Sequence, residues 1–103
     1  MPSRGASGAR VSAILKAIGH PTRLRILERI AERGLCVSDL EEALGLRQAN
    51  VSQHLAVLRD RGLVIAERRG NTTCYYLADP RIAEVITLMR DMLSREAEAE
   101  AVK

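Results

Sequence analysis

Apolar side chains recur at helical spacing in three stretches of the first sixty residues, which predicts three amphipathic helices. Their apolar positions are, in chain order, Val11, Ile14, Leu15 and Ile18, then Leu24, Leu27, Ile30 and Ala31, then Val51, Leu55 and Leu58. A glycine or proline follows each stretch and ends the helix. A shorter helix is predicted between the second and third stretches, because Ser38 and Glu41 have the spacing of a capping box and Gly45 follows.

The period changes after Gly62. The runs LVIAERR and TTCYYL are rich in residues that favour strands, and Gly70-Asn71 between them predicts a β-hairpin. Asp79-Pro80 then opens a last helix. The apolar stripe of this helix is Ile82, Val85, Ile86, Met89, Met92 and Leu93. The predicted fold is mainly α with a small β-hairpin.

The chain of 103 residues has room for one small domain. We expect that domain over residues 10–97, after a flexible tail over residues 1–9 and before a frayed C-terminus over residues 98–103. No apolar run approaches the roughly 18 residues of a membrane span, and MPSRGASGAR lacks the apolar region of a signal peptide. We therefore expect no membrane association and a cytoplasmic location.

Charge is distributed unevenly along the chain. Through Arg81 there are 13 basic and 8 acidic residues, whereas the remainder has 3 basic and 5 acidic residues. Fourteen of the sixteen basic residues are Arg, which suits contacts with phosphate and guanine. Taken alone, this charge fits a solvated Arg-rich surface better than nucleic-acid binding. Aromatic residues make up only 2% of the chain, which argues against stacking on single-stranded nucleic acid.

No motif of an enzyme is present: the chain has no glycine-rich phosphate loop, no G-x-S-x-G, no HExxH and no CxxC. We therefore expect a protein that is not an enzyme.

The connection Gly45-Leu46-Arg47 is typical of a helix-turn-helix, and a hairpin directly after it has the position of a wing. The runs GHPTRLRIL, GLCVSDLEEALGL, QANVSQHLAVLRDRGLV and ERRGNTTCYYLADPRI resemble the ArsR/SmtB family of bacterial repressors over residues 11–93. The resemblance implies a winged helix-turn-helix of order α-α-α-α-β-β-α. It also implies a homodimer that binds double-stranded operator DNA, an imperfect palindrome, and releases it when a ligand or thiol modification is sensed.

The fourth helix offers a polar face opposite Val51, Leu55 and Leu58. Residues near its N-terminal end are those that reach base edges in recognition helices. The predicted DNA contacts of this helix are Arg47, Gln48, Asn50, Ser52 and Gln53. A winged-helix adaptor that binds protein in place of DNA is the rival interpretation, but it predicts a neutral face, whereas Arg47, Arg59 and Arg61 flank this one.

Three polar residues surround the hairpin turn: Arg68, Arg69 and Asn71. An Arg pair at a wing tip suits a narrow minor groove, although charge that only keeps the turn soluble fits nearly as well. His20 and His54 are interpreted as structural residues, His20 at a helix boundary and His54 near the buried side of the fourth helix.

The resemblance also implies sensing sites, which this chain matches only in part. The last-helix zinc site keeps Asp79, but its other positions hold Arg81, Met92 and Arg95, so we expect no zinc site there. Of the family's CxC pair, GLCVSDL keeps only Cys36, and a second thiol, Cys74, lies in the hairpin.

Taken singly, each cysteine fits a small buried side chain, normally reduced in the cytoplasm, better than a sensor, but both thiols flank the DNA-binding unit. By elimination, any intrinsic regulation runs through Cys36 and Cys74, with arsenite or another soft metal ion, or cysteine oxidation or persulfidation, as the signal. The alternative is a regulator without cysteine sensing that is controlled by its level or by a protein partner.

The outer helices carry apolar stripes that one small domain cannot cover. Pairing them across a two-fold axis buries both stripes, which predicts a homodimer. The predicted dimer contacts are Val11, Ile14, Ile18, Ile82, Val85, Ile86, Met89, Met92 and Leu93.

Overall fold

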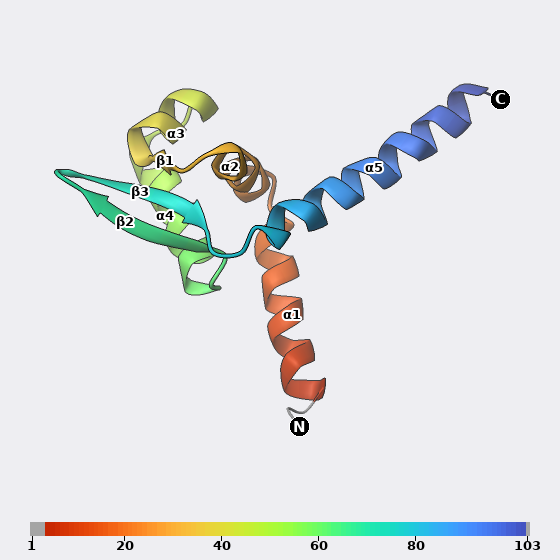
Figure 1. Ribbon diagram of the computed structural model, residues 1–103, viewed down its shortest axis with the longest axis horizontal. Coiled ribbons are helices and arrows are strands. Elements are labelled where there is room, and N and C mark those ends of the chain that lie inside the picture. Colours follow the sequence, from red (N-terminus) through yellow and green to blue (C-terminus); the bar gives the residue numbers. More distant parts are fainter. Residues whose placement is uncertain (1–3, 103) are drawn as a thin grey trace.

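Helices and a small sheet alternate along the chain in a computed structural model that describes residues 4–102, with side-chain surroundings described for residues 7–100 (Figure 1). The elements are α1 (Arg4–Ile18), α2 (Pro21–Glu32), β1 (Leu35–Cys36), α3 (Val37–Leu44), α4 (Gln48–Asp60), β2 (Val64–Arg69), β3 (Thr72–Leu77) and α5 (Arg81–Val102). The predicted winged helix-turn-helix, with four helices, a hairpin and a last helix, is confirmed. Within the described residues, no helix is long and apolar enough to cross a bilayer.

Both outer helices are longer than the sequence led us to expect. Helix α1 begins at Arg4, so residues 4–9 are helical, although we predicted a loose tail there; residues 1–3 of that tail lie outside the described residues. Helix α5 continues to Val102 and so includes residues 98–102, which we expect to fray. The first residues of α1 and the last of α5 have no apolar stripe to pack, which is why periodicity did not reveal them.

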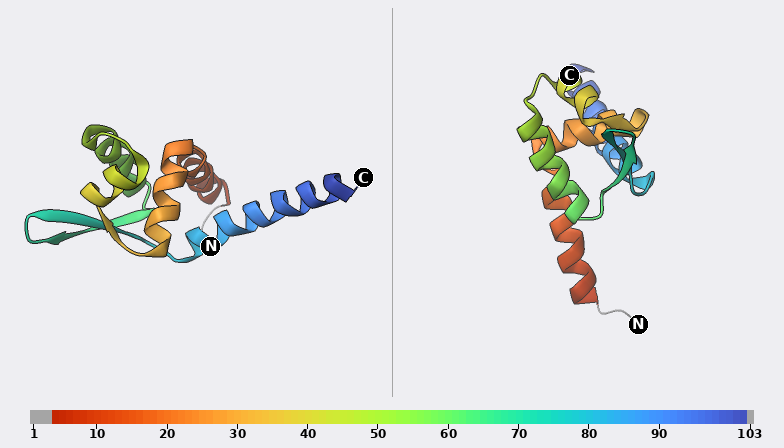
Figure 2. Two further views of the ribbon diagram at one scale, coloured as in Figure 1. Left: turned by 90° about the horizontal axis from the view of Figure 1, so that it is seen from above. Right: turned by 90° about the vertical axis from the view of Figure 1, so that its left-hand side faces the viewer.

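The core lies where α2, α3 and α4 meet the sheet. Its fully buried side chains are Ile26, Leu27, Leu40, Val51, Leu55 and Leu58. Helices α1 and α5 leave this body in different directions and extend as two arms (Figures 1 and 2). A bidentate ion pair links α5 to α2 partway along the second arm, where the Arg90 guanidinium of α5 donates to both carboxylate oxygens of Glu28 in α2, each at 2.6 Å.

The sheet has three strands in the order β1-β3-β2, all antiparallel. The hairpin of β2 and β3 pairs Arg69 with Thr72 around Gly70-Asn71, and Gly70 has a φ of 61°, the left-handed conformation that a two-residue turn with glycine first requires. This confirms the predicted hairpin. Strand β1 was not predicted, because two residues are too short to show a period. It pairs Leu35 with Tyr75 and Cys36 with Cys74, and so attaches the segment between α2 and α3 to the wing.

The start of α3 also differs from the prediction. Ser38 and Glu41 do not form the expected capping box, since α3 begins one residue before Ser38, at Val37, and Cys36 is its N-cap. The Asp39 carboxylate accepts a hydrogen bond from the Cys36 backbone N–H at 3.2 Å, which is one half of a capping box. The pairing of β1 therefore sets where the helix starts.

Gly34 leads directly into β1 and lies under the ring of Tyr76 from β3. A Cβ atom at position 34 would overlap the Cε1 and Cδ1 atoms of that ring. Only glycine lets the backbone approach the aromatic face this closely. Gly34 and Tyr76 therefore set how tightly β1 lies against the wing.

We predict that Gly34→Ala lowers the free energy of unfolding by about 1–3 kcal/mol, because the added methyl must displace the Tyr76 ring. Urea unfolding followed by circular dichroism measures this. Gly8→Ala is the matched control, since a Cβ there has no neighbour within 4 Å, and it should leave stability unchanged or raise it. In a Tyr76→Ala background the cost of Gly34→Ala should shrink; an equal cost in both backgrounds would place the strain elsewhere.

Candidate nucleic-acid interface and thiol pair

Helix α4 separates its buried and exposed residues as the helical wheel predicts. Val51, Leu55 and Leu58 are buried in the core. The predicted DNA-contacting residues of this helix are all exposed: Arg47, Gln48, Asn50, Ser52 and Gln53. The two alanines of this face, Ala49 and Ala56, are exposed as well. Their small side chains let the helix approach the bases in a DNA groove closely.

The N-terminal end of α4 is open. Its N-cap residue is Arg47, whose side chain makes no capping hydrogen bond within the described part of the chain. The Arg47 carbonyl instead accepts from the N–H groups of Asn50 and Val51, at 3.0 and 3.1 Å. The first N–H groups of the helix and its positive dipole end therefore lie beside a cation, an arrangement that favours phosphate.

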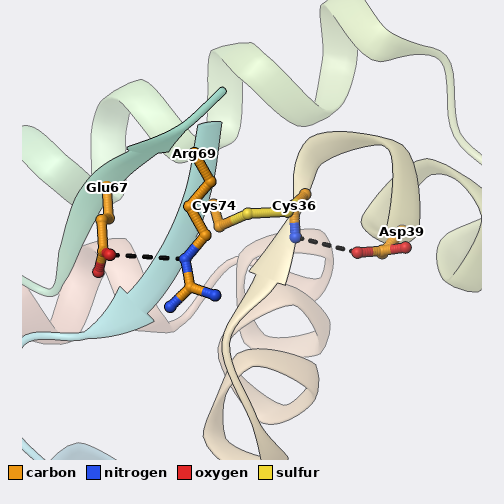
Figure 3. The surroundings of a disulfide bond; sticks show 5 residues. All are labelled: Cys36, Asp39, Glu67, Arg69 and Cys74. Atoms are coloured by element: carbon orange, nitrogen blue, oxygen red, sulfur yellow. Dashed lines mark hydrogen bonds and ion pairs between the residues drawn. A yellow bond between two sulfur atoms is a disulfide. The ribbon is translucent and has the colours of Figure 1, made fainter. Parts of the chain in front are cut away.

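The wing carries its arginines in fixed positions. Arg68, Arg69 and Asn71 are all exposed near the turn. Arg68 Nε donates to the Gly70 carbonyl at 3.3 Å. The Arg69 guanidinium lies 5.7 Å from the centroid of the Tyr76 ring and pairs with Glu67 at 3.5 Å. Figure 3 shows this ion pair beside the disulfide. The tip thus presents two cations, of which Glu67 partly neutralises one.

The two histidines lie together between α2 and α4, with ring centroids 4.7 Å apart. His20 Nδ1 accepts a hydrogen bond from the Thr22 backbone N–H at 3.1 Å and so caps α2, which confirms its predicted place at a helix boundary. Burial lowers the pKa of His54, and the nearby charges of His20 and Arg23 lower it further. The surroundings of His54 therefore favour its neutral imidazole over the protonated form.

Cys36 and Cys74 form a disulfide bond (Figure 3). They are register partners across β1 and β3, with Cα atoms 3.8 Å apart. The expectation that the two thiols are reduced is therefore wrong for this structure: the sheet pairing, invisible in the sequence, brings residues 38 positions apart into contact. Cys74 is 4% exposed, whereas Cys36 is only half-buried at the start of α3. Within the pair, Cys36 is the more exposed residue.

Asp79 caps the N-terminal end of α5. Asp79 accepts from the Arg81 backbone N–H at 2.9 Å and from the Arg81 guanidinium at 2.7 Å. The side-chain hydrogen bond from Arg81 is the main reason why the pKa of Asp79 falls to about 2. Among the described residues, no three His, Cys, Asp or Glu side chains are grouped so that they could hold a metal ion.

The outer helices expose most of the side chains that we assigned to dimerisation. Val11, Val85, Met89, Met92 and Leu93 are exposed, Leu93 to 64%, and Leu15 and Leu88 join them. Ile14, Ile18 and Ile82 are half-buried against the core. Ile86 departs from the prediction, since it is only 6% exposed and belongs to the core of its own protomer. Its place on the wheel matched the stripe, but the crossing of α5 over α2 covers it.

Two parts of the site were missed from the sequence. One is β1, which joins the thiols. The other is Tyr75, which lines a hollow of about 460 Å³ with Ser52, Ala56, Arg59 and Asp60, where the wing meets the exposed face of α4. The alternation of TTCYYL placed the tyrosines on a strand, but only the sheet register shows which one turns toward α4.

Comparison with known proteins agrees with this geometry. The sequence model described as "Bacterial regulatory protein, arsR family" matches residues 20–66. An uncharacterised HTH-type transcriptional regulator of Mycobacterium tuberculosis, Rv0081, is 44% identical over 81 residues, which are 78% of this chain and 71% of that protein. The crystal structure of Rv0081 matches with a TM-score of 0.80 at 40% identity, over 87% of this chain and 91% of that one.

Two further solved structures are similar. The homodimeric winged helix-turn-helix DNA-binding domain of a possible ArsR-family regulator from Mycobacterium bovis matches with a TM-score of 0.85 at 27% identity, over 96% of this chain and 93% of that chain. Reduced HlyU from Vibrio cholerae matches with a TM-score of 0.78 at 32% identity, over 86% and 94%. The polar face of α4, the wing after it and these relatives lead to one conclusion: the chain belongs to the ArsR family of DNA-binding transcriptional regulators, and it is not an enzyme.

Proposed function

We propose that this regulator is a homodimeric repressor that binds a palindromic operator and is released by a signal acting on its two cysteines. The Cys36–Cys74 bond is the observation that most directly supports this proposal, because it joins the helix-turn-helix to the wing, the two parts that would contact DNA. Dimerisation, DNA reading and thiol sensing each rest on separate residues, so each has its own test.

The arms supply the dimer contacts. The apolar stripes of α1 and α5 open onto one groove of about 360 Å³, lined by Val11, Leu15, Ile82 and Val85 among others. Beyond this groove, Leu88, Met89, Met92 and Leu93 stay exposed along α5. So many exposed apolar side chains on one face are unusual for a monomer. A second copy of the chain, related by a two-fold axis, covers the same face on both protomers. The homodimeric Mycobacterium bovis neighbour supports this choice of occupant.

We predict that the protein sediments as a dimer at micromolar concentration and that Leu93→Glu raises the dimer dissociation constant at least tenfold. Leu93 is 64% exposed, so the substitution spares the protomer's core while placing a charge in the proposed interface. Glu96→Gln, on the same helix, is the control and should leave the equilibrium unchanged. A wild-type chain that sediments as a stable monomer would contradict the proposed assembly.

The DNA contacts follow from the exposed face of α4. In a recognition helix, residues near the N-terminal end meet base edges in the major groove, and a Gln side chain pairs with adenine through two hydrogen bonds. Gln53 lies on the exposed face among small neighbours, which suits base reading. Arg69, at the wing tip, suits the phosphates of the minor groove. A two-fold dimer then selects an imperfect palindrome whose half-sites lie one or two helical turns apart, at about 10 base pairs per turn.

We predict that Gln53→Ala costs about 1–3 kcal/mol of operator binding and relaxes specificity at one base pair per half-site. Arg69→Ala should instead weaken operator and random DNA alike and flatten the salt dependence. Fluorescence anisotropy with both duplexes measures these effects. If Gln53→Ala weakens binding to operator and random DNA equally, the reading face is not the one we propose.

The sensing step begins at Cys36, since Cys74 is 4% exposed and Cys36 is the more exposed residue of the two. With hydrogen peroxide, the Cys36 thiolate attacks one oxygen, the O–O bond breaks and a sulfenic acid forms with loss of hydroxide. The Cys74 thiolate then attacks that sulfur, forms the S–S bond and displaces the second hydroxide. Two protons convert the hydroxides to water, and the two thiols have lost two electrons.

A sulfane-sulfur donor reaches the same product. The Cys36 thiolate takes the outer sulfur atom of a low-molecular-weight persulfide and releases a thiol. The Cys74 thiolate then attacks the Cys36 sulfur, forms the disulfide and displaces hydrosulfide. Arsenite or another soft ion would bind both thiolates directly and link β1 to β3 through the ion, without an S–S bond and without oxidation of the sulfurs. Every route ties β1 to β3 and removes the freedom of the wing to adjust to the minor groove.

We predict that reduced wild type binds the operator at least tenfold more tightly than the disulfide form, measured by anisotropy with peroxide, persulfide and arsenite in separate titrations. Cys36→Ser should abolish the response to each agent, because the more exposed of the two cysteines is lost. Cys74→Ser should stop at a modified Cys36, visible by mass spectrometry as an added oxygen or sulfur. A Cys36→Ser, Cys74→Ser double variant that responds as wild type does would exclude the thiols and favour control by protein level or by a partner.

A further inference from the structure

A cleft of about 470 Å³ lies between α1 and α4, on the side of α4 away from the wing. Among the described residues that line it, Lys16, Arg23 and Arg61 are cationic and none is acidic. Ser12 adds a hydroxyl group, and alanines of α1 leave the space open. Neither the base-reading face nor the wing uses these residues.

The three cations are held differently. Arg23 Nε donates to the Ala17 carbonyl at 2.9 Å, which fixes the guanidinium at the cleft and leaves its two terminal nitrogens as donors. Arg61 gives one terminal nitrogen to Asp60 at 2.7 Å. Lys16 is exposed and has no ion-pair partner within 4.0 Å among the described residues. The neighbourhood is thus positive and only partly compensated.

The cleft lies on the opposite face of α1 from the apolar stripe. At 100° per residue, the α1 residues that line the cleft centre on the side of the helix opposite Val11, Leu15 and Ile18, with Lys16 near the middle of that side. Covering the stripe with a second copy of the chain therefore leaves the cleft open. A cluster of cations that stays accessible in the proposed dimer calls for an anionic ligand.

We propose that this cleft binds a phosphate group, and that the phosphate is one of the operator backbone. The inference rests on the proposed DNA binding by α4. A helix with its side chains is about 10–12 Å wide and the major groove about 12 Å, so both flanks of an inserted helix face a phosphate strand. The wing and the Tyr75 hollow face one strand. Lys16, Arg23 and Arg61 face the other.

The test is the salt dependence of binding to operator and random duplexes. Lys16→Gln should reduce the slope of log K against log salt by about 0.9 per cleft on both DNAs, because one phosphate contact is lost per site, and leave the ratio of the two affinities unchanged. Lys16→Arg should restore the slope. Arg10→Gln is the matched control, since it removes one positive charge from the same helix outside the cleft lining, and it should leave the slope as in wild type.

A second experiment tests whether the cleft binds free phosphate. The melting temperature is compared in sodium phosphate and sodium chloride at equal ionic strength, for wild type and Lys16→Gln. Suppose that phosphate stabilises wild type but not Lys16→Gln, and that the salt slopes of DNA binding are the same for both. The ligand is then a free phosphate compound and not the operator backbone. Unchanged slopes without that stabilisation would overturn the site itself. If wild type binds no operator, the proposed function is contradicted. The melting temperatures in phosphate then test the cleft independently of DNA binding.

Discussion

The pairing of β1 with β3 is the contact on which the arrangement of this regulator depends. Two residues, Leu35 and Cys36, attach the segment between α2 and α3 to the second wing strand. Gly34 allows that approach because the ring of Tyr76 fills the space of a side chain. Helix α3 starts at the next residue, Val37, with Cys36 as its N-cap. The angle between helix-turn-helix and wing is therefore set within four residues, and the disulfide lies in the middle of them.

DNA contact and dimerisation are assigned to different parts of the chain. The core of α2, α3 and α4 with the sheet holds α4 and the wing together, and the basic residues gather on that part of the chain. The arms carry the apolar stripes, and the basic excess does not continue into α5. Among the described residues, the Glu28–Arg90 pair is the one ion pair between α5 and α2, with two hydrogen bonds of 2.6 Å. Dimerisation can thus position two DNA-binding bodies without using the residues that contact DNA.

Much of this fold was predictable because its helices carry strong apolar periods and its hairpin carries a glycine turn. The face of α4 followed from the wheel alone, since Val51, Leu55 and Leu58 define its buried side. Contacts between distant segments were not predictable. Strand β1 has no period, and the sulfur pairing depends on a register that only the folded sheet defines. Ile86 shows the same limit, because its wheel position matched the exposed stripe while the packing of α5 on α2 buried it.

The central claim is that the Cys36–Cys74 bond and operator binding are coupled. By linkage, a ligand that binds the reduced form more tightly makes the disulfide easier to reduce by the same free energy. The direct measurement is the midpoint potential of the cysteine pair in glutathione buffers, without DNA, with random duplex and with saturating operator. We predict that the operator raises the potential by about 30 mV for each tenfold preference for the reduced form, and raises it more than random DNA does. A potential that is the same with and without operator would contradict the coupling.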